Sequence, residues 1–237
     1  MDLTRRQALS AAAGLGAAAL AGLRAEAHGA GAPPRTPHEI VALPFDPRKL
    51  KGLSERLLTS HHDNNYAGAV KNLNKVEEQL ASVTKDTPGF LVAALREREL
   101  AFANSMTLHE LYFGNLGGSG AASAALQTAL SSAFGGFARF EELFRATGMS
   151  LAGGSGWAIL EYSFTTSDLR IFGSTSHVQS PAFAAPLLVL DMYEHAYALD
   201  YGAAAAQYLD AFMANVQWEE VTRRHDAARK AAQALKV

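Results

Sequence analysis

The sequence predicts an α+β fold, in which an antiparallel helical hairpin precedes an α/β domain with a small antiparallel sheet. Apolar residues recur at helical spacing over residues 47–81 and again over 90–113. Strand-like segments appear only beyond residue 156, and the short apolar run PLLVL at 186–190 is typical of a buried strand. A helical first part followed by a mixed second part is the pattern of an α+β protein.

The two long helices are expected to pack against each other, and each carries a histidine in its apolar stripe. Leu57 lies four residues before His61, while Phe102 and Phe113 lie seven residues before and four residues after His109. The turn TKDTPG between the helices is short, which favours an antiparallel hairpin. The hairpin therefore brings His61 and His109 onto facing helices.

The glycine-rich segment GGSG at residues 117–120 is the expected boundary between a hairpin domain (43–116) and a C-terminal α/β domain (121–237). The C-terminal pattern predicts helices at 121–133 and 137–148, paired strands at 157–165 and 169–172 around a turn at Ser167-Asp168, a strand at 186–190, and helices at 193–201, 203–215 and from 217 to the end.

Composition excludes several classes of protein. The 237 residues contain no cysteine, so thiolate metal sites, iron–sulfur clusters, disulfides and thiol nucleophiles are excluded. Lys and Arg number 21 against 23 Asp and Glu, and this balance gives no basic surface for nucleic acid. Any chemistry must use His, Asp, Glu, Tyr or a bound cofactor.

The first 27 residues have the organisation of a signal peptide. The pair Arg5-Arg6 precedes seventeen uncharged residues at 7–23, and a small-x-small site ends at Ala27. The paired arginines resemble a twin-arginine export signal. The alternative, a transmembrane helix, needs a longer and more apolar segment. We therefore expect export to the periplasm, no membrane span in the mature chain, and an extended Gly/Pro/Ala-rich leader at 28–42.

Four side chains are candidate metal ligands: His61, His109, Asp191 and His195. Asp191 directly follows the predicted buried strand, where a carboxylate is costly unless it is paired or bound to metal. His195 follows one helical turn later. Three imidazoles and one carboxylate without thiolate favour iron or manganese, although these donor types also suit zinc. The expected site lies between the hairpin and the α/β part.

Several motifs together resemble the iron/manganese superoxide dismutase family. They are LPF at 43–45, His61 placed eleven residues before NLN at 72–74, GSGW at 154–157, and DMYEHAY at 191–197. The last motif is the most specific, and the resemblance extends from about residue 42 to about residue 224.

The resemblance implies a site and an activity. One iron or manganese ion per subunit would be bound by His61, His109, Asp191 and His195, with solvent as a fifth ligand. The metal would alternate between divalent and trivalent states while superoxide is converted to dioxygen and hydrogen peroxide. The resemblance also implies a homodimer in which Glu194 bonds His195 across the interface.

The residues around these ligands depart from the family pattern. Trp157 is expected to pack beside the metal, and His177 or Gln179 to supply the hydrogen bond to bound solvent that a Gln provides in manganese-type members. His62 and Tyr66 are further substitutes, although they need not face the metal. The departures are Asn65 for a His, Ala69 for the gateway Tyr, Ser105 for a Gln, Phe113 and Tyr193 for Trp, and Ala198 for a Tyr.

Three functions are compatible with this pattern. The first is an exported superoxide dismutase with a rebuilt proton supply. The second is a metal-binding protein of the same fold with little dismutase activity, serving as a metal carrier or oxidant sensor. The third is a metal-dependent oxidase or peroxidase, in which Ala69 and Ser105 admit a larger substrate. The four intact ligands and Glu194 favour the first.

Overall fold

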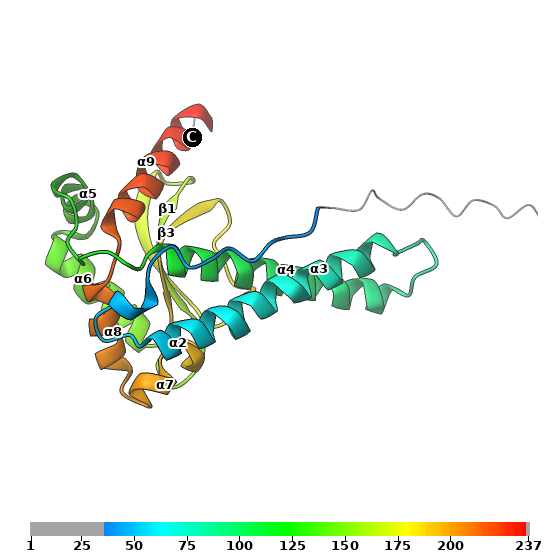
Figure 1. The fold of residues 1–237 in the computed structure, drawn as a ribbon. Helices are drawn as coiled ribbons and strands as arrows, with labels where there is room; N and C mark the ends of the chain where they lie inside the picture. The colour runs from blue at the N-terminus through cyan, green and yellow to red at the C-terminus, as the bar shows by residue number, and fades with distance from the viewer. Residues whose placement is uncertain (1–35, 236–237) are drawn as a thin grey trace, which may run out of the picture.

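The computed structural model of the chain describes residues 36–235 (Figure 1). The expected signal peptide at 1–27 and the leader up to residue 35 lie outside the described residues. Within residues 36–235, no helix combines the length and the apolar character needed to cross a bilayer.

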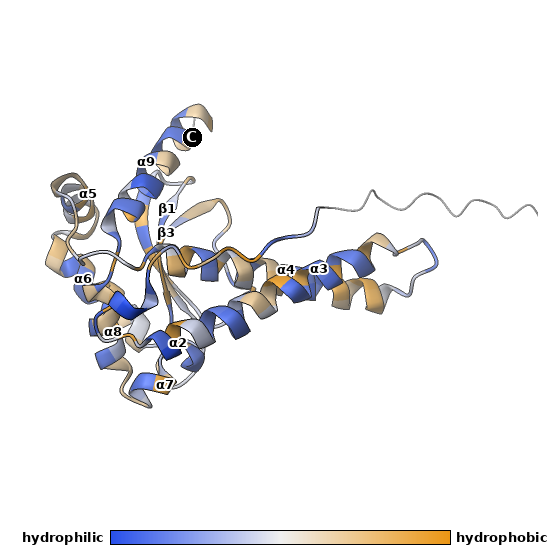
Figure 2. Ribbon diagram, in the orientation of Figure 1, coloured by the Kyte–Doolittle hydropathy of each residue, from blue (hydrophilic) through white to orange (hydrophobic). Residues whose placement is uncertain are grey.

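The predicted helical hairpin is confirmed, and its two arms lie side by side and project from the body of the molecule (Figure 1). The second arm, α4, runs from Gly89 to Gly114 and nearly matches the predicted 90–113. Its free end carries exposed apolar residues, among them Phe90, which is 76% exposed (Figure 2).

The first arm is not the single helix predicted over 47–81. Ser54 accepts a hydrogen bond from the backbone N–H of Leu57 and so caps the start of the helix, because its side chain satisfies an otherwise free donor. A π-helical turn then interrupts the arm where the first candidate ligand lies. The segments are η1 (Pro47–Lys49), α2 (Glu55–Ser60), the π turn η2 (His61–Tyr66) and α3 (Ala67–Ala81).

The second part contains the predicted helices and the small antiparallel sheet. One predicted helix, 193–201, is instead two short helical segments, because Tyr197 has φ −146° and ψ −25° and breaks the helix. The segments are α5 (Ala124–Phe134), α6 (Phe137–Met149), β1 (Trp157–Ser163), β2 (Asp168–Ser174), β3 (Ala184–Asp191), the 3₁₀ turn η3 (Glu194–Ala196), α7 (Ala198–Tyr201), α8 (Ala205–Ala214) and α9 (Trp218–Leu235).

The sheet has the order β2-β1-β3, and both pairings are antiparallel. The central strand β1 is buried along its whole length, as expected for a strand with neighbours on both edges and helices over its faces. In the register of β1 and β3, Trp157 lies directly opposite Asp191. The sheet thus places an indole beside the carboxylate at the end of β3.

The C-terminal end of α4 is fastened to the edge of the sheet. The buried side chain of Asn115 donates to the carbonyl of Leu187 and accepts from the N–H of Val189, as a neighbouring strand would. The following segment, 117–120, is held by hydrogen bonds from Gly118 to Asn215 and from Gly120 to Val216. These contacts fix the hairpin relative to β3, and therefore fix His109 relative to Asp191.

Candidate metal centre

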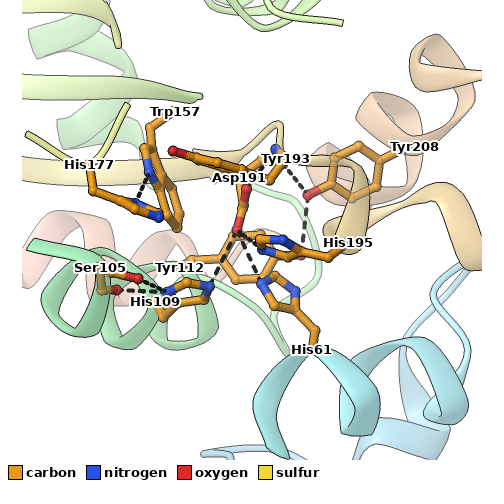
Figure 3. Close-up of polar contacts among 10 residues, drawn as sticks. All are labelled: His61, Ser105, His109, Tyr112, Trp157, His177, Asp191, Tyr193, His195 and Tyr208. Carbon is orange, nitrogen blue, oxygen red and sulfur yellow. Dashed lines mark hydrogen bonds and ion pairs between the residues drawn. The ribbon is translucent and has the colours of Figure 1, made fainter. Parts of the chain in front are cut away.

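The four predicted ligands meet at one point between the hairpin and the sheet (Figure 3). The Nε2 atoms of His61, His109 and His195 lie 3.1, 3.6 and 3.2 Å from Oδ2 of Asp191. One potential donor atom from each residue lies within 4.8 Å of the others. His61, His109 and Asp191 are at most 1% exposed, whereas the His195 side chain is 26% exposed.

Each ligand comes from a different element. His61 begins the π turn η2, His109 lies in α4, Asp191 ends β3, and His195 lies in η3. Asp191 is held at its side chain and at its backbone, because the N–H of Tyr193 donates to carboxylate Oδ1 at 2.8 Å and the Tyr208 hydroxyl donates to the backbone carbonyl at 2.8 Å. Asp191 therefore presents Oδ2 to the three imidazoles.

The hydrogen bonds of His109 fix which of its nitrogens can bind a metal. Nδ1 lies 2.6 Å from the Ser105 carbonyl, and a carbonyl can only accept, so Nδ1 carries the proton. Burial lowers the pKa of His109 to about 3, and this keeps the ring neutral. Nε2 is therefore an unprotonated nitrogen, buried without a hydrogen-bond partner.

The pKa values of the two other buried residues, His61 and Asp191, are also lowered. Burial lowers the pKa of His61, although its hydrogen bond to Asp191 acts in the opposite direction. Burial would raise the pKa of Asp191, but the hydrogen bonds from His195 and His61 outweigh it and hold this pKa well below its usual range. The buried Asp191 carboxylate thus lies against His61 and His109, whose pKa values are both lowered by burial, and a bound cation would supply the positive charge that a buried carboxylate requires.

A single first-row metal ion fits this arrangement. Imidazole nitrogen and carboxylate oxygen bind such ions at about 2.0–2.2 Å, so donor atoms around one ion lie about 3–4 Å apart. The three separations from Asp191 Oδ2 have this size, and the unpartnered Nε2 of His109 would gain a partner. The donor set of three nitrogens and one oxygen suits iron or manganese.

An aromatic group adjoins the cluster on the sheet side. The rings of His109 and Trp157 meet edge to face with centroids 5.1 Å apart, and the Trp157 indole N–H donates to Nδ1 of His177 at 3.1 Å. Tyr193 stacks on His177 at 4.7 Å and on His195 at 5.3 Å. Trp157 therefore lies beside the cluster, between His109 and His177.

Gln179 does not occupy the position expected for it. Its side chain is exposed, and Oε1 accepts from the backbone N–H and the hydroxyl of Thr175. His177 lies beside the cluster instead, since its ring centroid is 6.4 Å from that of His109. The loop that carries His177 and Gln179 has no regular pattern, so the sequence alone does not show which of the two faces the cluster.

The polar groups of the two other proposed substitutes bond the chain outside the cluster. His62 and Tyr66 both bond the backbone of Val41 in the leader. Phe113 packs on the His61 ring with centroids 5.0 Å apart, and Glu194 is exposed next to His195.

The sequence prediction missed Tyr112 and Tyr208. Their hydroxyls lie 3.2 Å apart, and Tyr208 also supports the Asp191 carbonyl. Their only signal in the sequence is a place in an apolar helical stripe, which does not distinguish them from ordinary core residues.

Comparison with known proteins agrees with this geometry. Residues 122–224 match the family model of iron/manganese superoxide dismutases, C-terminal domain. The iron superoxide dismutase of Cupriavidus metallidurans is 45% identical over 192 residues, which cover 81% of this chain and 98% of that protein. The chain belongs to the iron/manganese superoxide dismutase family.

More distant relatives include both metal types. The iron superoxide dismutase of Aquifex pyrophilus is 34% identical over 80% of this chain and 92% of its own length. Manganese superoxide dismutase 1 of Halobacterium salinarum is 30% identical over 81% of this chain and 96% of its own length. Family members of either metal type thus match over nearly their own full length and over about four-fifths of this chain.

Proposed function

We propose that the protein is a superoxide dismutase with one iron or manganese ion per subunit, bound by His61, His109, Asp191 and His195. The observation that carries this proposal is the convergence of three imidazole Nε2 atoms on one buried carboxylate oxygen. The bound metal would supply one-electron redox chemistry, which converts superoxide to dioxygen in one half-reaction and to hydrogen peroxide in the other.

His177 is the residue proposed to hydrogen-bond solvent at the site. Its Nδ1 accepts from Trp157, so in the neutral ring Nε2 carries the proton and is a donor. The stacked Tyr193 and the bond to Trp157 hold the ring in place. His177 would thus replace the Gln that other family members use. The Ser105 carbonyl already accepts the hydrogen bond from His109.

Metal analysis followed by a superoxide assay tests this function. We expect stoichiometric iron or manganese and fast turnover. His109→Ala and Asp191→Ala should each abolish metal binding without unfolding the chain, while Glu97→Ala, exposed on α4, should retain metal. Full metal occupancy in either ligand variant would refute the assignment.

The second candidate function is a metal carrier or oxidant sensor, and the substitutions Asn65, Ala69, Ser105 and Ala198 favour it. These replace residues that the family uses around the metal. Stoichiometric metal with activity no better than that of the free ion would exclude the dismutase and leave the carrier or sensor and the metal-dependent oxidase or peroxidase.

We propose further that the protein is a homodimer bridged by Glu194 and His195. In the single chain Glu194 is exposed and the His195 side chain is 26% exposed, so both can reach a partner. Glu194→Ala should shift the sedimentation velocity towards that of a monomer, while Glu219→Ala, exposed on α9, should not. A dimer of unchanged stability in Glu194→Ala would overturn the bridge.

Export through the twin-arginine route is proposed from Arg5-Arg6 and the apolar segment that follows. This route exports folded proteins, so metal could be inserted before export. Replacing both arginines with lysine should keep the protein inside the cell. Normal export of that variant, measured by fractionation, would contradict the proposal.

A further inference from the structure

The leader segment is connected to the metal centre through the backbone of one residue, Val41. The Val41 N–H donates to the Tyr66 hydroxyl at 2.9 Å, and the Val41 carbonyl accepts from Nε2 of His62 at 2.8 Å. The Val41 side chain is 60% exposed, so the hairpin recognises the backbone and not the side chain.

These two contacts span the π turn that begins with His61. His62 and Tyr66 lie four residues apart in η2, and both are buried, with 8% and 1% of their surface exposed. A π turn is rare and is commonly found at functional sites. The Val41 backbone contacts the π turn near its start, at His62, and at its end, at Tyr66. These contacts fix the direction in which the His61 ring leaves the helix.

The same contacts reach the second ligand. The Tyr66 hydroxyl donates to Oε1 of Glu110 at 2.8 Å, and Glu110 directly follows His109 in α4. His62 directly follows the ligand His61, as Glu110 follows the ligand His109. Tyr66 and the Val41 backbone thus connect His62 with Glu110. Phe113 packs against the two of these side chains that lie in η2, with its ring centroid 5.6 Å from that of His62 and 6.3 Å from that of Tyr66.

We propose that Tyr66 and the Val41 backbone are positioning groups of the metal centre, which hold His61 and His109 at the spacing that one ion requires. Neither group touches the metal, and the inference rests on the ligand set proposed above. A second contact anchors the leader farther along, where the Asn74 side chain bonds both the N–H and the carbonyl of His38. The leader is therefore a part of the site that precedes the hairpin in sequence.

The test compares metal release from the full mature chain and its variants. Val41→Pro removes the N–H while the exposed side chain stays apolar, and Val41→Ala keeps the N–H and is the matched control. Tyr66→Phe removes the hydroxyl and leaves the ring. Partners of metal ligands typically change affinity by about 10–100-fold, so we expect Val41→Pro and Tyr66→Phe each to speed release to a chelator by about tenfold.

Two further readouts separate positioning from a general loss of stability. The absorption spectrum of the metal-loaded Val41→Pro and Tyr66→Phe variants should shift, while melting of their metal-free forms stays close to that of Val41→Ala. The double variant should release metal no faster than the faster single variant, because both changes break one connection.

Release and spectrum of Val41→Pro equal to those of Val41→Ala would overturn the inference, and so would fully additive effects. The proposed activity fails separately, because a wild-type protein that binds metal without dismutase turnover leaves these comparisons unchanged.

Discussion

Glu161 places a carboxylate in the middle of the buried strand β1. The residue is only 4% exposed, and its cross-strand neighbour Arg170 is bonded to Asp168 instead. Burial raises the pKa of Glu161 above its usual 4.5, and the charge of Arg170 offsets this only in part. The folded protein therefore holds this proton more tightly than the unfolded chain.

This difference makes stability depend on pH. Where the folded state binds more protons, the free energy of unfolding falls as pH rises, here from about 4.5 upward. Glu161→Gln should therefore melt higher than wild type at pH 7, and the gain should vanish below pH 4. The exposed Glu97→Gln is the control and should show no such trend. A gain independent of pH would contradict the assignment.

Gly114 leaves room for a buried guanidinium. Arg224 donates to the carbonyls of Leu111 and Leu187 and is paired with Glu220. A Cβ at position 114 would lie 2.6 Å from Nη2 of Arg224.

Gly114→Ala should cost about 1–3 kcal/mol in urea unfolding, because Arg224 must move from its carbonyl partners. Gly89→Ala, at the other end of α4 with no atom within 4 Å of the new Cβ, should change stability by less than about 0.5 kcal/mol. Equal effects of the two variants would show that space near Arg224 is not limiting.

Among the elements, α4 and β3 are joined most directly by Asn115, whose buried side chain satisfies two backbone groups of the strand edge. Asn115→Ala leaves the buried Val189 N–H without a partner and removes one of the two donors to the Leu187 carbonyl, so it should cost about 1–3 kcal/mol, measured by chemical unfolding. Asn72→Ala, on the exposed face of α3, should be nearly neutral. A similar small loss at position 115 would mean that water replaces the amide.

The sequence predicted elements well where local pattern determines them. The bounds of α4 agree to within one residue, since its apolar spacing, the preceding Pro88 and the break after Gly114 are all local signals. The π turn was not predictable, because HHDNNY has ordinary helical spacing and the extra residue is stabilised by the distant Val41. Tyr197, where the predicted helix is broken, stacks on Tyr208, a contact that the local pattern does not encode.

The same division applies to the site. Motif spacing identified the four residues that converge, whereas the residues around them depend on contacts between loops. His177 instead of Gln179 faces the cluster because the Trp157 indole bonds it, and no local pattern encodes that bond.

Across the whole molecule, the metal centre joins two halves that are otherwise in contact mainly through α4 and β3 (Figure 1). Two ligands come from the hairpin and two from the segment that ends β3 and follows it. Metal bound to the folded state alone must therefore stabilise the entire chain.

Removal of metal should lower the melting temperature substantially. Free metal at 1,000 times its dissociation constant stabilises the folded state by about 4 kcal/mol. Calorimetry of the metal-bound and metal-free proteins measures the difference, which His109→Ala should abolish. An equal melting temperature with and without metal would contradict a site shared by both halves.

The unequal burial of the four ligands gives the centre a direction. Three of them are sealed to within 1% exposure, and only the imidazole of His195 reaches solvent. An incoming ion would meet His195 first and a departing ion would leave it last, so the His195 ring marks the solvent-accessible side of the site. Association of a second subunit over Glu194 would cover the exposed His195 ring, and the exchange of metal would then be slower in the assembled protein than in the single chain.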